Sequence, residues 1–313
     1  MGRRETTKES AATDRRLSSI LLPTTTSFTA AEELDVDGLV SNIRKWRQAG
    51  ISGFVLLGST GERVHLDESE YLRTLEAARA EIPADGAFIA GVGQHSTRGT
   101  IAEIGKAVQC GADAVLVLTP HYYRSAITQD ALVNHYNAVA DASSVPVLLY
   151  SMPALTGIKI APETIARLSE HDNIIGVKDS SDDVAGLTQT VKLCPPGFAV
   201  LTGNGTVLLD ALEAGATGAI LAVGCVVPEI CLELFDAFHR DDQQRARALQ
   251  TKLAPLAAAV TTKYGIGGLK AALDLAGYHG GAVRAPLRPP DDSARAEIAR
   301  LLNDVQQVSP PAL

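Results

Sequence analysis

The sequence has few aromatic residues, few cysteines and no long apolar segment. Only 4% of the 313 residues are aromatic, and the four cysteines lack the paired spacing of metal ligands. The seven histidines are scattered without an HxH or HExxH pair, so we expect no metal site. Cysteines of this kind are typical of reduced thiols in the cytoplasm, where we expect the protein to reside.

Positive charge is also scarce. Lys and Arg number 28 against 36 Asp and Glu, a net charge of −8, which repels polyanions and argues against a nucleic-acid partner. The longest apolar runs, such as 217–227, are shorter than the ~20 residues that a membrane helix needs, so no membrane partner is expected. Residues 1–17 are polar, lack the apolar core of a secretory signal and are predicted to form a mobile tail.

The chain does have a regular alternation of short apolar runs and amphipathic segments. The runs predict eight strands, at 18–22, 53–57, 87–91, 113–118, 145–150, 174–178, 198–202 and 217–222. The segments predict helices at 37–49, 67–82, 97–110, 128–141, 162–170, 182–193, 205–214 and 228–239. Near-continuous apolar strands separated by helices imply a parallel sheet that is covered on both faces.

Eight such units favour closure into a (β/α)₈ TIM barrel, a fold of the α/β class, over an open doubly wound sheet. We assign the barrel to residues 18–240. Residues 241–313 are predicted to form a C-terminal helical extension, with about three additional helices after the eighth unit. No low-complexity linker separates the two parts.

In such barrels, reactive side chains lie at the carboxyl ends of the strands. Lys178 ends the sixth predicted strand, within NIIGVKDSS. Burial disfavours the charged form of a lysine and makes the neutral amine available to attack a carbonyl group, which is Schiff-base chemistry. The alternative is an ordinary lysine whose ammonium group reaches solvent or pairs with Asp179.

Tyrosines occupy two neighbouring strand ends. Tyr150 ends the fifth predicted strand, next to Lys178, where a phenol can transfer protons during imine formation and carbon–carbon cleavage. The alternative is a half-buried aromatic residue that anchors the barrel rim. Tyr122 and Tyr123 follow the fourth strand and allow the same two interpretations.

Small polar loops follow the second and seventh strands. Backbone N–H groups of the GSTGE segment, together with Ser59 and Thr60, suit a carboxylate, although these residues are also common in ordinary turns. Glu62 is interpreted as a first-turn acid that the helix dipole favours. Gly203 and the Asn-Gly pair that follows it permit a ligand, including a phosphate, to approach the backbone closely.

Six segments, in order, resemble the dihydrodipicolinate synthase / N-acetylneuraminate lyase superfamily of lysine-dependent, class I aldolases. The resemblance extends from about residue 18 to residue 290. The segments are GSTGE (58–62), TPHYYR (119–124), YSMPALTG (150–157), IIGVKDSS (174–181), TGNG (202–205) and YGIGGLKAALDLAGYHGGAVRAPL (264–287).

The resemblance implies a role for each residue at the barrel mouth. Lys178 is expected to form the Schiff base with a 2-oxo acid, and Tyr150 to act as proton relay and general acid and base. Ser59 and Thr60 are expected to hold the substrate carboxylate. The other expected substrate contacts are Ser180, Gly203 and Ile220. No cofactor or metal is expected, because the iminium serves as the electron sink.

The resemblance also implies a homo-oligomer, a dimer or a tetramer. In family members a tyrosine of the TPxYY loop reaches into the site of a neighbouring subunit. Tyr122 and Tyr123 are both candidates for this role, because the residue between Pro120 and the tyrosines shifts the register.

Departures from the family patterns bear on the substrate. Dihydrodipicolinate synthases usually carry an arginine at the position of Leu155, and neuraminate lyases carry acidic residues where 204–206 read Asn-Gly-Thr. The KDS, YSMP and C-terminal segments look most like 4-hydroxy-2-oxoglutarate aldolases, which cleave a 4-hydroxy-2-oxo acid to pyruvate and an aldehyde.

Several alternatives remain. Within the superfamily they are a 4-hydroxy-tetrahydrodipicolinate synthase and an aldolase or dehydratase of 2-keto-3-deoxy sugar acids. From other classes they are a non-catalytic small-molecule-binding barrel and a phosphate-binding isomerase.

Overall fold

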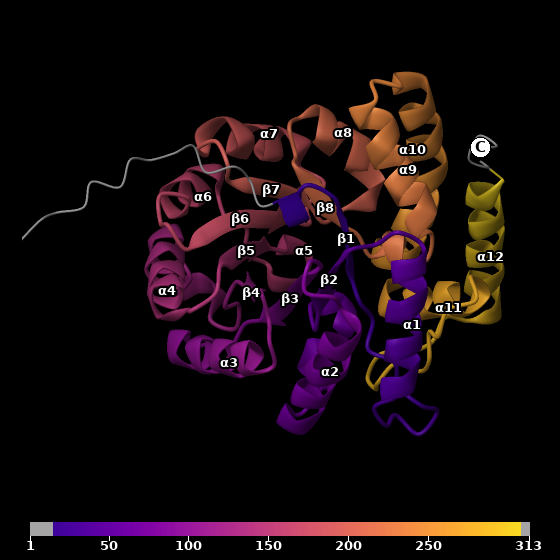
Figure 1. Cartoon of the computed structure of the whole chain (residues 1–313), viewed down its shortest axis with the longest axis horizontal. Helices are drawn as coiled ribbons and strands as arrows, with labels where there is room; N and C mark the ends of the chain where they lie inside the picture. Colours follow the sequence, from indigo (N-terminus) through magenta and orange to yellow (C-terminus); the bar gives the residue numbers. More distant parts are fainter. Residues whose placement is uncertain (1–14, 308–313) are drawn as a thin grey trace, which may run out of the picture.

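The computed structural model describes residues 15–307, whose eight parallel strands form a closed barrel in sequence order. The strands lie at the centre of Figure 1, with the helices around them. They are β1 Ile20–Pro23, β2 Gly53–Leu56, β3 Ala87–Val92, β4 Ala114–Leu118, β5 Val147–Ser151, β6 Ile174–Asp179, β7 Ala199–Thr202 and β8 Gly218–Ile220. β8 pairs with β1. The prediction of a (β/α)₈ barrel is therefore confirmed, and the open sheet was wrong.

Each predicted helix is present, with ends shifted by a few residues. The helices between and after the strands are α1 Val36–Gln48, α2 Glu68–Glu81, α3 Thr97–Gln109, α4 Gln129–Ala142, α6 Pro162–Leu168, α7 Val184–Leu193, α8 Leu208–Glu213 and α9 Pro228–His239. Their starts follow from side-chain caps, as in α2, where Asp67 and Glu70 form a reciprocal capping box. A one-turn helix that the sequence did not indicate, α5 Pro153–Thr156, follows β5.

The barrel has an inner and an outer apolar layer because successive strand residues point to opposite faces. Leu21, Val55, Leu116 and Ile220 belong to the inner cluster, whereas the outer cluster joins the strands to the helices. Leu17 belongs to the same inner cluster and is buried, within a 3₁₀ turn over Arg15–Leu17. The folded part thus begins before residue 18, and the rest of the predicted tail lies outside the described residues.

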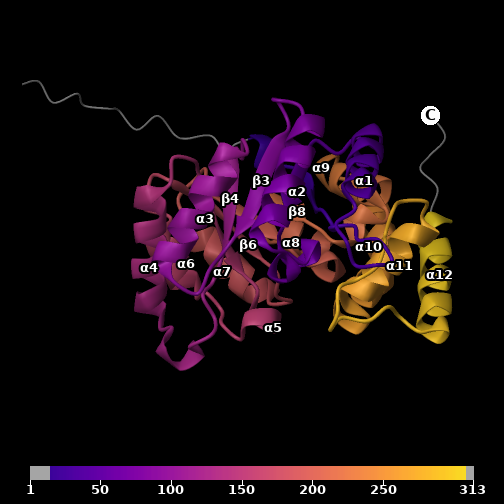
Figure 2. The same ribbon diagram turned by 90° about the horizontal axis from the view of Figure 1, so that it is seen from below.

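The C-terminal part adds α10 Gln243–Ala258, α11 Gly265–Leu275 and α12 Asp292–Gln306, with a π-helical turn over Ala259–Lys263. Figure 2 shows these helices together on one side of the barrel. α10 packs against α9, and α11 packs against α12. Within residues 15–307, no helix is both long and apolar enough to cross a bilayer.

Candidate active site

Lys178 and Tyr150 lie side by side at the carboxyl end of the barrel. They are register partners on β6 and β5, and Lys178 Nζ lies 4.4 Å from the centroid of the Tyr150 ring. Each residue is only 4% exposed, so the ammonium group does not extend into solvent. The Asp179 carboxylate accepts a hydrogen bond from the Ser181 backbone N–H at 2.8 Å.

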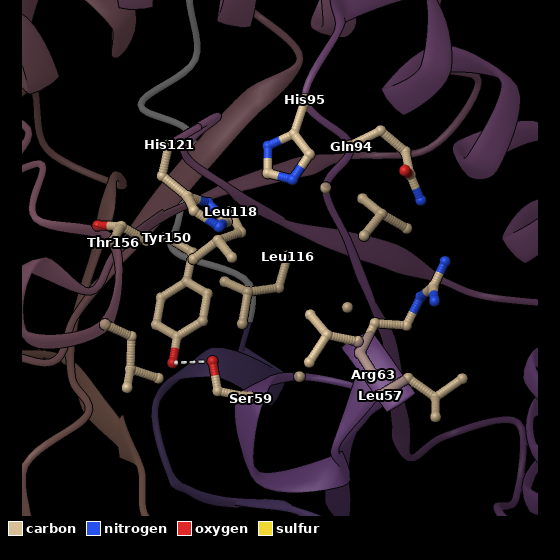
Figure 3. A pocket seen from close by; sticks show the side chains of 16 residues that line it. Leu57, Ser59, Arg63, Gln94, His95, Leu116, Leu118, His121, Tyr150 and Thr156 are labelled. Atoms are coloured by element: carbon tan, nitrogen blue, oxygen red, sulfur yellow. Dashed lines mark hydrogen bonds between the residues drawn. The ribbon is translucent and has the colours of Figure 1, made fainter. Parts of the chain in front are cut away.

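The Tyr150 hydroxyl lies among polar groups. Its oxygen is 3.3 Å from Ser59 Oγ, the hydrogen bond drawn in Figure 3. Burial alone raises the pKa of Tyr150, but the positive charge of Lys178 and hydrogen bonds with Ser59, Ser180 and Lys178 outweigh it, so the pKa is lowered overall. The Tyr150 phenol therefore loses its proton more readily than an ordinary tyrosine.

Gly203 leaves the space that the stem of Lys178 occupies. A Cβ atom at this position would lie 2.7 Å from Lys178 Cε and would also overlap the Ser180 side chain. The Gly203 backbone N–H donates to Asp179 O at 2.6 Å, which holds the loop after β7 against the end of β6. A side chain at position 203 would therefore displace Ser180 and Lys178.

The GSTGE segment forms a short loop after β2. Ser59–Gly61 is a single 3₁₀ turn, in which Thr60 is buried. The sequence suggested that Glu62 is a first-turn acid of a helix, and this interpretation was wrong. Glu62 has a left-handed backbone, with φ of 51°, and its buried carboxylate lies 2.6 Å from Lys270 Nζ. Glu62 is buried because its loop packs against α11, a tertiary contact that the local sequence does not reveal.

A cavity of about 500 Å³ opens beside Tyr150 and Ser59. Its apolar wall includes Leu57, Leu116, Leu118 and Leu155. Leu155 belongs to α5 and is 64% exposed, so it lies at the open mouth. Tyr150 is part of the cavity wall. Lys178 does not line the cavity itself but lies against the Tyr150 ring.

Sequence reasoning missed a polar wall of the same cavity, which includes Arg63 and Gln94. Figure 3 shows both on the side of the cavity away from Tyr150. The Glu103 carboxylate pairs with Arg63 and accepts from Gln94 Nε2 at 3.1 Å and from the Gly93 N–H at 2.8 Å. Burial lowers the pKa of Arg63.

Of the remaining predicted site residues, two lie close to Tyr150 and two are exposed at the barrel rim. Ser180 is close enough to hydrogen-bond Tyr150. Ile220 is fully buried in the inner apolar cluster that also contains Tyr150. Tyr122 and Tyr123 are 71% and 70% exposed, and neither is among the residues that line the cavity.

Tyr122 and Tyr123 belong to a group of aromatic rings at the rim. Their ring centroids are 5.0 Å apart. The His95 ring contacts Tyr122 and His121 edge-on, with centroids at 5.7 and 4.7 Å. His95 and His121 also line the cavity, and Figure 3 shows them together at its upper side. Among residues 15–307, no group of three or more His, Cys, Asp or Glu side chains is arranged to hold a metal ion.

Comparison with known proteins identifies the family. The model of the dihydrodipicolinate synthetase family matches residues 16–305. The chain belongs to this family. An uncharacterised DapA-like lyase of Halobacterium salinarum is 39% identical over 289 residues, 92% of this chain and 94% of that protein. 4-Hydroxy-tetrahydrodipicolinate synthase 1 of Streptomyces coelicolor is 37% identical over 296 residues, 94% of each chain.

Solved structures of the dihydrodipicolinate synthetase family have the same fold. YagE, a prophage protein of E. coli K12 whose structure contains pyruvate, has a TM-score of 0.86 and 31% identity. The match covers 92% of this chain and 98% of YagE. A monomeric dihydrodipicolinate synthase variant has a TM-score of 0.88 and 28% identity, with 93% and 98% coverage. The superfamily suggested by the sequence is thus confirmed.

Proposed function

We propose that this family member is a Schiff-base aldolase that cleaves a 4-hydroxy-2-oxo acid, such as 4-hydroxy-2-oxoglutarate, to pyruvate and an aldehyde. The observation that carries the proposal is the buried Lys178 amine, 4.4 Å from the centroid of the Tyr150 ring. The phenol beside it has a lowered pKa, because the Lys178 charge and hydrogen bonds outweigh the effect of burial. The pyruvate in the structure of the related YagE agrees with a 2-oxo acid ligand.

The reaction begins when the neutral Lys178 amine attacks the 2-oxo carbon of the substrate. Loss of water leaves an iminium, which withdraws electrons from the C3–C4 bond better than the ketone does. Tyr150, or a water that it orders, removes the proton of the C4 hydroxyl. The C3–C4 bond then breaks, the aldehyde departs, and the bonding electrons form an enamine. Protonation at C3 and hydrolysis release pyruvate and regenerate Lys178.

The cavity wall favours an aldolase over a synthase. At position 155, where dihydrodipicolinate synthases usually carry an arginine for a second carboxylate, this chain has Leu155 at the mouth of the cavity. An exposed leucine supplies no charge to that carboxylate. The synthase remains the second candidate because curated relatives, including the Streptomyces coelicolor protein, bear that name.

The direct test is a panel of 2-oxo acids with coupled detection of pyruvate. We expect 4-hydroxy-2-oxo acids to release pyruvate, and aspartate semialdehyde to condense poorly with pyruvate. Leu155→Arg should improve the condensation, with Leu155→Met as the uncharged control. Faster turnover of aspartate semialdehyde than of every cleavable acid would favour the synthase, and cleavage of 2-keto-3-deoxy sugar acids alone would favour a sugar-acid aldolase.

A non-catalytic binding barrel predicts a different result. It would bind pyruvate reversibly, without a covalent adduct after borohydride. A phosphate-binding isomerase would use the Gly203–Gly205 loop, but the Asn204 side chain there already bonds with Thr206, accepting from its N–H at 3.0 Å and from its hydroxyl at 2.7 Å.

We further propose that the chain acts as a homo-oligomer. The exposed Tyr122 and Tyr123 side chains are the residues expected to enter a neighbouring site. Light scattering should show at least a dimer. Of Tyr122→Phe and Tyr123→Phe, only the variant at the trans-acting tyrosine should lose activity without loss of assembly. A fully active monomer would contradict this proposal.

A further inference from the structure

The loop that carries Ser59 has a strained backbone at both of its ends. Leu57 has a φ of 59° and Glu62 a φ of 51°, a left-handed conformation that few residues other than glycine adopt. Between them, Ser59 Oγ lies 3.3 Å from the Tyr150 hydroxyl. Such a backbone persists only where surrounding contacts hold it, so the contacts of this loop determine where Ser59 and Thr60 lie.

Backbone packing holds the first end of the loop. A Cβ atom at Gly91 would lie 2.5 Å from Leu57 O, so β3 supports Leu57 only because residue 91 is glycine. Near the second end, Thr26 Oγ1 donates a hydrogen bond to Gly61 O at 2.6 Å. These contacts come from β3 and from the segment that follows β1.

A buried ion pair holds the second end. Glu62 Oε1 lies 2.6 Å from Lys270 Nζ, and both side chains are only 1% exposed. Lys270 also donates to Ala282 O at 2.5 Å. The other carboxylate oxygen of Glu62 accepts the Arg284 backbone N–H at 3.2 Å and bonds with His65 Nδ1 at 3.0 Å. The Glu62 carboxylate is therefore held at both oxygens, by the ion pair at Oε1 and by hydrogen bonds at Oε2, which fix the position of its side chain.

An aromatic ring completes the contact between loop and extension. Lys270 Nζ lies 4.5 Å and Arg284 Cζ lies 4.3 Å from the centroid of the buried Phe28 ring, within the range of cation–π attraction. Lys270 belongs to α11 and Arg284 to the segment after it. Both cations that surround this ring therefore come from the C-terminal helical extension.

We infer that Glu62 and Lys270 are positioning residues of the active site. Their ion pair joins the GSTGE loop to α11 and determines how Ser59 and Thr60 face the substrate carboxylate. The inference rests on the proposed function for the identity of that carboxylate, which belongs to a 2-oxo acid. The C-terminal extension is then part of the construction of the active site, although neither Glu62 nor Lys270 touches substrate.

Positioning and simple stabilisation make different predictions for a double variant. Removal of one partner of a buried ion pair leaves an unpaired charge and strongly destabilises a protein, whereas replacement of both by neutral residues of similar shape is often tolerated. Glu62→Gln combined with Lys270→Met removes both charges and preserves side-chain volume. The double variant should therefore fold, but without the ionic contact that keeps the loop in its left-handed conformation.

The experiment compares the full-length wild type, both single variants, the double variant and Lys263→Met. The last is a matched control, because Lys263 forms a lysine–glutamate pair with Glu297 at 2.6 Å in the same extension, on an exposed surface. Thermal melting is measured together with the pyruvate concentration that half-saturates borohydride trapping, and with kcat and KM for cleavage.

We expect the double variant to melt close to the wild type and yet to need about tenfold to a hundredfold more pyruvate, the scale of a small misplacement of binding groups. KM should rise more than kcat falls, and Lys263→Met should match the wild type. Wild-type pyruvate dependence in the double variant would overturn the inference. Absence of trapping in the wild type would instead refute the proposed function.

A crystal structure of the double variant tests the inference independently of catalysis. We expect residue 62 to leave the left-handed region and the hydrogen bond between the Ser59 and Tyr150 hydroxyls to be lost. Retention of both features in the double variant would show that the ion pair does not position the loop.

Discussion

Two buried lysines occupy two different regions of the molecule. Lys178, at the barrel mouth, and Lys270, in the C-terminal extension, are 4% and 1% exposed. Each amine lies over an aromatic ring, Lys178 at 4.4 Å from Tyr150 and Lys270 at 4.5 Å from Phe28. Lys270 has a carboxylate at 2.6 Å, whereas the partner of Lys178 is a phenol with a lowered pKa.

The comparison indicates that the partner, rather than burial, distinguishes Lys270, which is held in an ion pair, from Lys178, the proposed nucleophile. Burial lowers the pKa of Lys270, and the Glu62 carboxylate opposes that effect by favouring the charged form. An ammonium held by a carboxylate is a poor nucleophile. A lysine beside a phenol can instead exchange a proton with it, which imine formation requires.

The largest effect is expected from replacing Lys178, compared with the same kind of replacement at Lys270. Lys178→Ala should abolish pyruvate release, because no other amine occupies that position. Lys270→Met should lower the melting temperature and weaken binding but retain measurable turnover. A pyruvate-release assay of both variants checks this, and full activity of Lys178→Ala would refute its role.

A smaller but still large loss should follow Gly203→Ala. The added methyl group would meet Lys178 Cε at 2.7 Å, and displacement of a reacting group by about 1 Å can cost roughly a hundredfold in rate. Steady-state kcat should fall accordingly. Gly105→Ala is the control: Gly105 lies within α3, has no left-handed backbone, and a Cβ there would meet nothing within 4 Å. Equal losses in the two variants would exclude a specific effect on Lys178.

The third prediction concerns the partner of Lys178. The lowered pKa of Tyr150 implies that phenolate forms below the usual pH of about 10, so cleavage should slow as pH falls through that pKa. Tyr150→Phe should lose about 10²- to 10⁴-fold in kcat, the range for a general acid or base, and lose this pH dependence. Ser59→Ala, which removes one hydrogen bond to the phenol, should shift the wild-type profile to higher pH. An unchanged profile would contradict the assignment.

The last prediction concerns stability rather than catalysis and rests on the buried His135 side chain. Burial lowers the pKa of His135 to about 4, against about 6.5 in the unfolded chain. The unfolded state therefore binds a proton between these values and the folded state does not. Stability should fall by about 3 kcal/mol as pH is lowered from above 6.5 to 4. Acid titrations of urea unfolding should show this loss in the wild type and a weaker one in His135→Gln; identical curves would count against it.

The parts of the site that the sequence predicts are those that strand order alone brings together. Apolar runs located the eight strands, and residues at the carboxyl ends of adjacent parallel strands must be neighbours. Lys178 and Tyr150 are therefore adjacent for a topological reason, and β5 and β6 place them in register. The position of Gly203 beside Lys178 is predictable for the same reason, because Gly203 directly follows β7, the strand next to β6.

The parts that the sequence did not predict depend on single charges far apart in the chain. Arg63 and Glu103 are separated by 40 residues, and Glu62 and Lys270 by 208. A lone charged residue in a helix or loop gives no periodic signal, and Glu62, the only one of the four that the sequence singled out, was interpreted as a first-turn acid. Only the packing of α3 on the loops, and of α11 on the GSTGE segment, brings these charges together.

The most direct test of the account is to treat the protein with pyruvate and borohydride, digest it and map the reduced adduct by mass spectrometry. The account predicts one modified peptide, with the pyruvate-derived group on Lys178 and none on Lys270. An adduct on Lys270 or on another lysine, or no adduct under conditions in which the protein cleaves its substrate, would contradict it.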